Sequence, residues 1–361
     1  MKGLRNPPTG SAAALGGLLA LSALAVLTPE RIQARPEYAK AEGKSCAYCH
    51  EDPKGGKRRN YRGRYYGQKM HSFAGFNNAD EAKKAGVVPL PEEGATLAAF
   101  KATTDPKLLP DFAEWVGPAG ITFIKIPAGA FLRGTTDAQK AELQKAGVWT
   151  AMDAVEQPSR EVRLTRPFLL SKTEVTQAQW KALMNGANPS AFKGDTLPVE
   201  NISWPETQAF CKALRDAEPN AFYRLPTEAE WEYVARAGST DLYAMGADKT
   251  PITPATLKEY TWMNGTANNK TQPVGTKKAN AWGLHDMQGN VWEWCQDWYS
   301  PTSYASLPPA DPLYKSTAAT ERVLRGGCWY LDSRAQRVAL RGGNLPTYKS
   351  QYAGFRVVRE L

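Results

Sequence analysis

The alternation of short apolar runs with loops rich in Gly, Asn and Pro, which begins at Ile121, constrains the fold more than any other feature. Such runs are typical of β-strands. Strands and helices do not alternate regularly here, as they would in a doubly wound parallel sheet. The pattern therefore predicts an α+β domain with short strands and long loops. The predicted strands lie within 121–129, 162–171, 322–330 and 354–360.

Three stretches of this region carry helix signals. Thr176 is a suitable N-cap for the stretch that follows it, and residues 204–217 space their apolar side chains for one helical face. Thr227 precedes Glu230 by three residues, which is the spacing of a capping box, and Gly238 is suited to end that helix. We therefore expect three helices among the strands.

Seven motifs occur in a fixed order along this region, at 123–134, 172–184, 188–204, 223–238, 273–299, 322–330 and 354–359. They include the sequences PTEAEWEYVARAG, GNVWEWCQDWY and GFRVVR. Together they resemble the formylglycine-generating enzyme (sulfatase-modifying factor) family over residues 119–361. The resemblance implies a C-type-lectin-like variant of the α+β class.

Catalytic members of that family oxidise a cysteine in a sulfatase peptide, using two cysteines that bind copper. The matching positions in this sequence are Leu331 and Gln336, and neither side chain can replace a thiolate on monovalent copper. Cys328 occupies a position where Ser is usual, so it is no substitute. A related branch needs three histidines for iron, and this region contains only His285. We therefore expect a domain without formylglycine-generating activity.

The resemblance also implies a calcium site in the loop DMQGNVWEW. Its ligands would be the side chains of Asp286 and Glu293 with the backbone carbonyls of Gly289 and Val291, a mixture of oxygen donors that suits calcium. Local capping or pairing by the two carboxylates is the alternative. A second family site lacks its Asn, which corresponds to Tyr260.

Three cysteines fall in this region. Cys295 and Cys328 lie on segments that should pair as neighbouring strands, which leaves open a disulfide or two reduced core thiols. Cys211 matches a family position whose usual partner is Val357 here, so we expect a buried free thiol. The tryptophans are expected in the core rather than in a ligand cage, and they are Trp282, Trp292, Trp294, Trp298 and Trp329.

The N-terminus has the features of an export signal. Lys2 and Arg5 precede an uncharged apolar run over 11–27, and Ala34 offers a small residue before a cleavage site. We therefore assign residues 1–34 to a signal peptide or N-terminal membrane anchor. The rest of the chain is expected to be periplasmic or extracellular, with membrane association left open.

A small basic module follows over residues 35–90. It contains Cys46 and Cys49 followed by His50, the C-x-x-C-H motif in which two thiols attach haem and the imidazole binds its iron. A zinc site would need two further nearby ligands, and only His71 is available. The segment therefore resembles a small helical, mono-haem c-type cytochrome with one covalent haem c. His71 is favoured as second axial ligand, and Met70 is the alternative.

Charge supports this division of the chain. Residues 35–90 carry 12 basic and six acidic side chains, a net charge of +6 out of +9 for the whole chain. The basic patch within 54–69, from Lys54 to Lys69, is suited to dock an acidic redox partner or a membrane-bound respiratory or photosynthetic complex, while a solvated loop face is the alternative. Export and haem attachment argue against nucleic acid as the partner.

Residues 91–118 are assigned to a linker, in which the apolar stretch 112–116 is expected to dock onto the domain that follows. The leading hypothesis is an exported electron-transfer cytochrome with a non-catalytic docking or structural domain at its C-terminal end. A haem-assisted oxidase acting on a peptide or thiol in the family groove is one alternative. A haem-based sensor or binding protein is the other.

Overall fold

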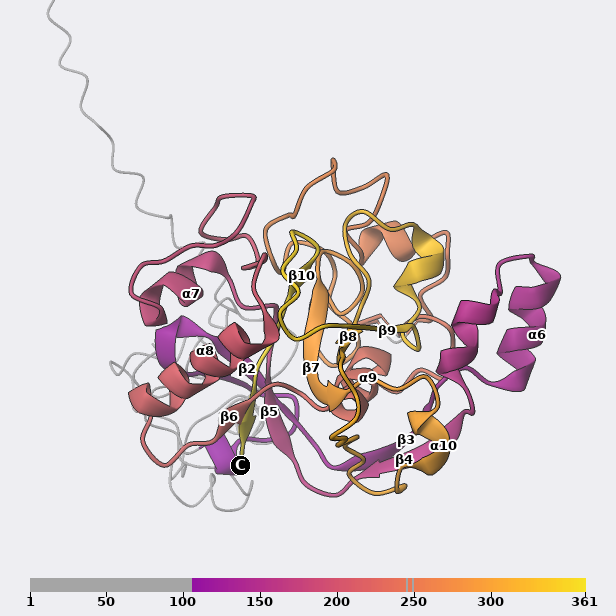
Figure 1. Cartoon of the computed structure of the whole chain (residues 1–361), viewed down its shortest axis with the longest axis horizontal. Helices are drawn as coiled ribbons and strands as arrows, with labels where there is room; N and C mark the ends of the chain where they lie inside the picture. Colours follow the sequence, from indigo (N-terminus) through magenta and orange to yellow (C-terminus); the bar gives the residue numbers. More distant parts are fainter. Residues whose placement is uncertain (1–105, 245, 249) are drawn as a thin grey trace, which may run out of the picture. The chain divides into compact units, whose positions relative to one another are not determined.

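The computed structural model describes residues 106–361 apart from Met245 and Lys249 (Figure 1). The proposed signal segment and haem module, with Cys46, Cys49, His50, Met70 and His71, lie outside these residues. The basic patch from Lys54 to Lys69 lies outside them as well. Within the described range, no helix combines the length and the apolar character that a bilayer span requires.

Three sheets organise the described part of the chain, which confirms the α+β class. In spatial order, the five-stranded sheet contains β1 (Glu114–Val116), β2 (Thr122–Ile126), β5 (Phe168–Ser171), β11 (Val358–Glu360) and β6 (Tyr223–Arg224). The four-stranded sheet contains β10 (Ala353–Gly354), β7 (Trp292–Trp298), β8 (Arg322–Arg325) and β9 (Arg341–Asn344). A hairpin pairs β3 (Gly129–Arg133) with β4 (Arg160–Leu164).

The first sheet includes the apolar stretch that was predicted to dock from the linker. Strand β1 pairs antiparallel with β2, with Trp115 opposite Phe123. Both side chains are buried, and their rings lie 5.6 Å apart. The folded domain therefore begins within the segment that the sequence assigns to the linker.

The three predicted helices are present. They are α7 (Gln177–Leu183), α8 (Trp204–Ala217) and α9 (Glu228–Arg236). Thr176 caps α7, and Thr227 forms the predicted capping box of α9 with Glu230. Helix α9 ends one residue earlier than expected, because Ala237 adopts the left-handed conformation before Gly238.

Two further helices are not predicted by the sequence patterns. They are α6 (Asp137–Lys145) and the short α10 (Ser303–Ser306), which lie near the β3–β4 hairpin in Figure 1. Helix α6 buries only Leu143, so it has no apolar stripe to reveal it. Its start is fixed by the local capping box of Thr136 with Gln139.

Two hydrophobic clusters form the core. One lies between helices α7 and α8 and the five-stranded sheet, where Trp180 stacks on Phe210 with ring centroids 5.4 Å apart. The other surrounds Trp231 of α9, whose helix contacts β3, β7 and β8. Strand β7 runs between these clusters, since Trp294 belongs to the first and Cys295 to the second.

Candidate functional site

The loop before β7 carries the residues predicted to bind calcium. Asp286 and Asn290 both adopt positive φ angles, near 55°, and Gly289 has a φ of 89°. A Cβ on Gly289 would lie 2.4 Å from the Trp262 carbonyl oxygen, so this position requires glycine. The tight loop places Asn290 beside the buried Glu174, 3.5 Å from its carboxylate.

Glu293 does not face an open site. Its carboxylate forms a two-point ion pair with Arg356, at 2.6 and 2.8 Å, and accepts a third hydrogen bond from the Trp231 indole at 2.7 Å. All of these side chains are fully buried. These contacts link β7, α9 and the segment before β11. They correspond to the alternative in which the Glu293 carboxylate pairs locally and is not a calcium ligand.

The carboxylates of Asp286 and Glu174 have fewer hydrogen-bond partners than that of Glu293. We call these two residues the unpaired cluster. One oxygen of Asp286 accepts from the Gly275 amide at 2.6 Å, while its other oxygen and Glu174 Oε1 are buried without a hydrogen-bond partner. Burial raises the pKa of Asp286 to about 6, despite the Gly275 amide and Arg356. Burial, together with Asp286 and Glu293, raises the pKa of Glu174 well above its usual value.

A calcium ion could use the free oxygen of Asp286, whereas the Arg356 guanidinium already neutralises Glu293. Among residues 106–361, no group of three or more His, Cys, Asp or Glu side chains is arranged to hold a metal ion. Calcium in this loop stays a prediction, for which Asp286 is the better placed of the two carboxylates.

The positions that match the copper-binding cysteines lie in the loop after β8. Gln336 is fully buried, and its amide nitrogen donates to the Cys328 and Leu331 carbonyl oxygens at 3.3 Å each. Leu331 is half-buried in the same loop. Cys328 is the thiol of this loop, and burial raises its pKa to about 11. This donor set does not fit monovalent copper, which needs soft thiolate or thioether ligands.

Of the two alternatives for Cys295 and Cys328, the structure has the reduced core thiols, since all three cysteines of the described chain are free and buried. The strand pairing itself is present, because β7 pairs antiparallel with β8. The register sets Glu293 opposite Arg325, and the Trp329 amide donates to the Asn290 carbonyl. Cys328 therefore lies level with Asn290 and not with Cys295. Cys211 is a buried free thiol, as predicted.

The tryptophans divide into two groups. Trp294 and Trp329 are buried in the core, as predicted, and Trp282 and Trp292 pack against it while partly exposed. Trp298 is also partly exposed and lines a pocket at the other end of β7. His285 is half-buried, and its ring Nδ1 lies 2.8 Å from the Lys277 carbonyl oxygen.

Sequence patterns miss a second buried cluster, centred on helix α9. All nine residues of this helix are buried, although its sequence looks amphipathic. Glu228 pairs with Arg133 at 2.8 Å and with Arg341 at 2.6 Å. Glu232 pairs with Arg236 and Arg325, at 2.8 and 2.6 Å. We call these two glutamates and four arginines the paired cluster.

Arginine proximity determines the charge state of the paired cluster. Burial alone would raise the pKa of Glu228, but Arg341, Arg133 and Arg325 outweigh it and lower the pKa to about 2. The pKa of Glu232 is lowered in the same way, against its burial, chiefly by Arg236 and Arg325. Both carboxylates are therefore charged at neutral pH and are compensated by arginines from β3, β8, β9 and α9 itself.

Comparison with known proteins identifies the class of domain. Residues 118–361 match the family described as "Sulfatase-modifying factor enzyme 1-like domain". The chain therefore belongs to this family, as its ordered motifs predict.

Curated relatives share parts of the chain. A formylglycine-generating enzyme of Streptomyces coelicolor is 38% identical over 198 residues, which cover 52% of this chain and 60% of that enzyme. The match thus spans less than two thirds of that relative. A chaperone protein LppX of Paenibacillus barcinonensis is 31% identical over 241 residues, which cover 53% of this chain and 80% of that protein.

Solved structures support the fold. PvdO from Pseudomonas aeruginosa superimposes with a TM-score of 0.60 at 23% identity, over 70% of this chain and 100% of that one. The Treponema denticola variable protein 1 gives a TM-score of 0.57 at 28% identity, over 69% and 99% of the two chains. At 23% identity, the likeness to PvdO concerns the fold alone.

Proposed function

We propose that this chain is an exported c-type cytochrome that transfers single electrons, and that its sulfatase-modifying-factor domain is a non-catalytic docking and structural module. Cys46 and Cys49 would hold haem c covalently, with His50 as one axial ligand and His71, or alternatively Met70, as the other. The supporting observation in this half of the chain is the C-x-x-C-H sequence behind an apolar N-terminus.

The observation that supports a non-catalytic domain is the environment of Gln336. Its side chain hydrogen-bonds to two backbone carbonyls of its own loop and is fully buried. An amide in this position provides neither a thiol nucleophile nor a soft metal ligand. The nearby thiol of Cys328 has a raised pKa, so little of it is thiolate at neutral pH.

The basic patch from Lys54 to Lys69 would steer an acidic redox partner, on its own or within a membrane-bound complex. Such steering acts on the association rate and weakens with salt. Electron-transfer rates to a candidate partner should therefore fall as ionic strength rises.

A visible spectrum of the purified full-length protein, recorded with and without carbon monoxide, tests the proposal. We expect covalently bound haem that is six-coordinate and low-spin in both redox states, so that the reduced protein binds little carbon monoxide. Ready binding at an open iron position would contradict electron transfer and favour the oxidase or sensor alternatives. Absence of covalent haem would contradict the cytochrome assignment altogether.

The neighbouring residues Met70 and His71 provide a matched pair of variants. We expect His71→Ala to open the iron to carbon monoxide, while Met70→Ala leaves the spectrum of the wild type. The reverse result would assign Met70 as the ligand. If neither variant changed the spectrum, the sixth ligand would lie elsewhere in the chain.

A further inference from the structure

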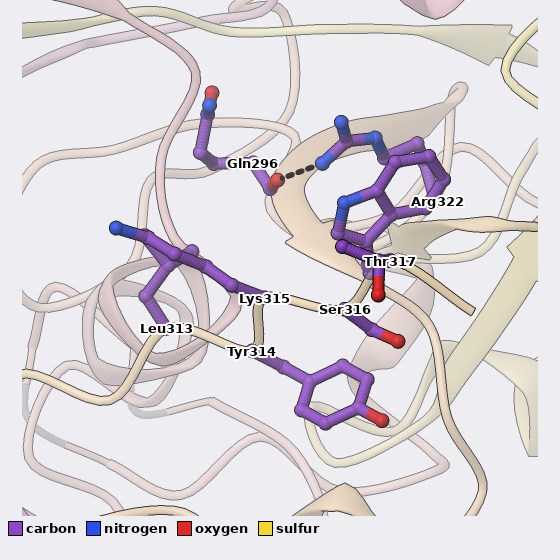
Figure 2. A pocket seen from close by; sticks show the side chains of 8 residues that line it. Gln296, Leu313, Tyr314, Lys315, Ser316, Thr317 and Arg322 are labelled. Carbon is purple, nitrogen blue, oxygen red and sulfur yellow. Dashed lines mark hydrogen bonds between the residues drawn. The ribbon is translucent and has the colours of Figure 1, made fainter. Parts of the chain in front are cut away.

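A pocket lies beside the C-terminal end of β7 and has a volume of about 660 Å³ (Figure 2). This volume is within the range of small-molecule sites. Its walls come from β7, from the start of β8 and from the loop that precedes β8. The lining residues are Gln296, Trp298, Leu313, Tyr314, Lys315, Ser316, Thr317 and Arg322. They include two cations, three hydroxyl groups and no carboxylate.

Arg322 is held in place without an ion pair. Its guanidinium lies between the Trp204 ring, 3.8 Å away, and the Trp298 ring, 3.6 Å away. One nitrogen donates to the Gln296 carbonyl oxygen at 2.7 Å, the bond drawn in Figure 2, while Nε is buried without a partner. Within the described chain, no carboxylate lies within ion-pair distance of this arginine. Burial lowers its pKa to about 10, and Asp297 opposes that shift only in part.

The wall of the pocket that contains Tyr314 is held to strand β7. Asp297 accepts a hydrogen bond from the Tyr314 amide at 2.9 Å, and the Trp298 amide donates to the Tyr314 carbonyl at 3.1 Å. The second oxygen of Asp297 accepts from the Glu228 amide at 2.7 Å, so it faces helix α9 and not the pocket. Lys315 follows in this wall, is exposed and makes no ion pair within residues 106–361.

We propose that this pocket binds a small organic anion, with its oxyanion group on Arg322 and its apolar body against Leu313 and Trp298. A guanidinium fixed by two indole rings offers preoriented N–H donors to a carboxylate or phosphate group. Lys315 adds a second positive charge to the lining, which also includes the hydroxyl groups of Tyr314, Ser316 and Thr317. No charged group of the wall opposes an anion.

This pocket is separate from the positions that match the family's catalytic cysteines. Cys328 lies level with Asn290, before β7 begins, whereas the pocket starts at Gln296. At about 3.3 Å per residue, the two places are roughly 20 Å apart along the strand. Binding in the pocket therefore does not depend on the electron-transfer proposal or on chemistry at Gln336.

Isothermal titration calorimetry of the full-length protein with phenyl phosphate tests whether the pocket binds an organic anion. Benzyl alcohol serves as a neutral ligand with the same ring, and inorganic phosphate as the oxyanion without it. We expect phenyl phosphate to bind more tightly than either. Benzoate, titrated in parallel, distinguishes a carboxylate ligand from a phosphate ligand. Equal binding of benzyl alcohol, or no binding of both anions at millimolar concentration, would overturn the proposal.

Two variants localise the binding. Arg322→Lys keeps the charge but removes the planar guanidinium, and we expect it to weaken phenyl phosphate binding at least 10-fold. Lys315→Gln changes an exposed side chain, so the fold is retained, and it should weaken binding two- to fourfold. Lys270→Gln removes a matched exposed charge outside the pocket and should leave binding unchanged. Equal affinities in wild type, Arg322→Lys and Lys315→Gln would place the bound anion elsewhere and overturn the proposal.

Discussion

The paired cluster around helix α9 and the unpaired cluster of Glu174 and Asp286 both bury carboxylates, but they balance the charge in opposite ways. Glu228 and Glu232 are surrounded by arginines from three strands and from α9 itself. Glu174 and Asp286 have one buried oxygen each without a partner. The pKa of Glu228 is lowered to about 2, whereas that of Asp286 is raised to about 6.

The comparison teaches that burial alone does not decide the role of an acidic side chain. Where cations are built in, the carboxylate stays charged and acts as a structural link between elements. Where they are missing, the site gains from a proton or a cation. The following predictions test this difference, beginning with the largest effect.

Removing one cation from the paired cluster should destabilise the protein most. Arg325→Met leaves Glu232 with Arg236 as its remaining ion-pair partner and removes three hydrogen bonds to backbone carbonyls. Loss of one partner of a buried ion pair costs about 3–5 kcal/mol in the free energy of unfolding. Urea denaturation followed by circular dichroism measures it. A loss below about 1 kcal/mol would mean that the paired cluster contributes little to the free energy of unfolding.

Calcium should act on the unpaired cluster. If Asp286 is a ligand, calcium at 100 times its dissociation constant stabilises the folded state by about 2.7 kcal/mol. Thermal unfolding in EGTA and in calcium gives this difference. Asp286→Asn should remove the response, while the matched variant Asp332→Asn, of a half-buried aspartate in another loop, should retain it. No response in the wild-type protein would show that this loop does not bind calcium.

Glu200 is another buried carboxylate with one oxygen that lacks a partner, and it allows a test of how stability depends on pH. It is fully buried, Oε1 accepts from the Phe192 amide at 2.9 Å and Oε2 has no partner. Burial raises its pKa to about 7. The folded state therefore holds this proton more tightly than the unfolded state, so its contribution to stability is full below pH 4.5 and is lost as the pH rises through 7.

Glu200→Gln keeps the Oε1 acceptor and removes the charge. The gain in the free energy of unfolding over the wild type should be about 2 kcal/mol larger at pH 8 than at pH 5, because the wild type loses the stabilising proton of Glu200 between these pH values. Unfolding experiments at several pH values measure this difference. A constant difference across that range would contradict the raised pKa.

The smallest effect should come from an exposed ion pair. Lys212 and Asp216 lie one turn apart on helix α8, and both side chains are more than half exposed. Lys212→Ala should change the free energy of unfolding by about 0.3 kcal/mol, because exposed pairs are screened by water. The same urea experiment compares it with Arg325→Met. A loss as large as that of Arg325→Met would remove the distinction between buried and exposed pairs.

Local signals in the sequence predicted the local structure. Thr227 and Glu230 defined the start of α9 because a capping box involves residues three positions apart. The buried surroundings of that helix could not be predicted, since Arg133, Arg325 and Arg341 are distant in the sequence. The register of β7 and β8 cannot be predicted from local signals either, so the sequence leaves a Cys295–Cys328 disulfide open.

The candidate site shows the same difference between features that residue types predict and contacts that only the fold creates. Residue types alone indicated that Leu331 and Gln336 cannot serve as copper ligands. They do not reveal that Arg356 forms an ion pair with Glu293, or that the guanidinium of Arg322 lies between the rings of Trp204 and Trp298. These contacts join segments separated by between 24 and 118 positions, as the residue numbers show, and the fold alone brings them together.

The burial of Gln336 has a consequence for any attempt to engineer a copper site into this loop. A Cβ on Gly327 would lie 2.6 Å from Gln336 Oε1, and the amide nitrogen spans two carbonyls above it. Cysteines introduced at positions 331 and 336 would supply two sulfur atoms, but the second would replace a buried amide that holds two backbone carbonyls of the loop. Engineering a copper site here would therefore require a redesign of the loop backbone as well as new ligands.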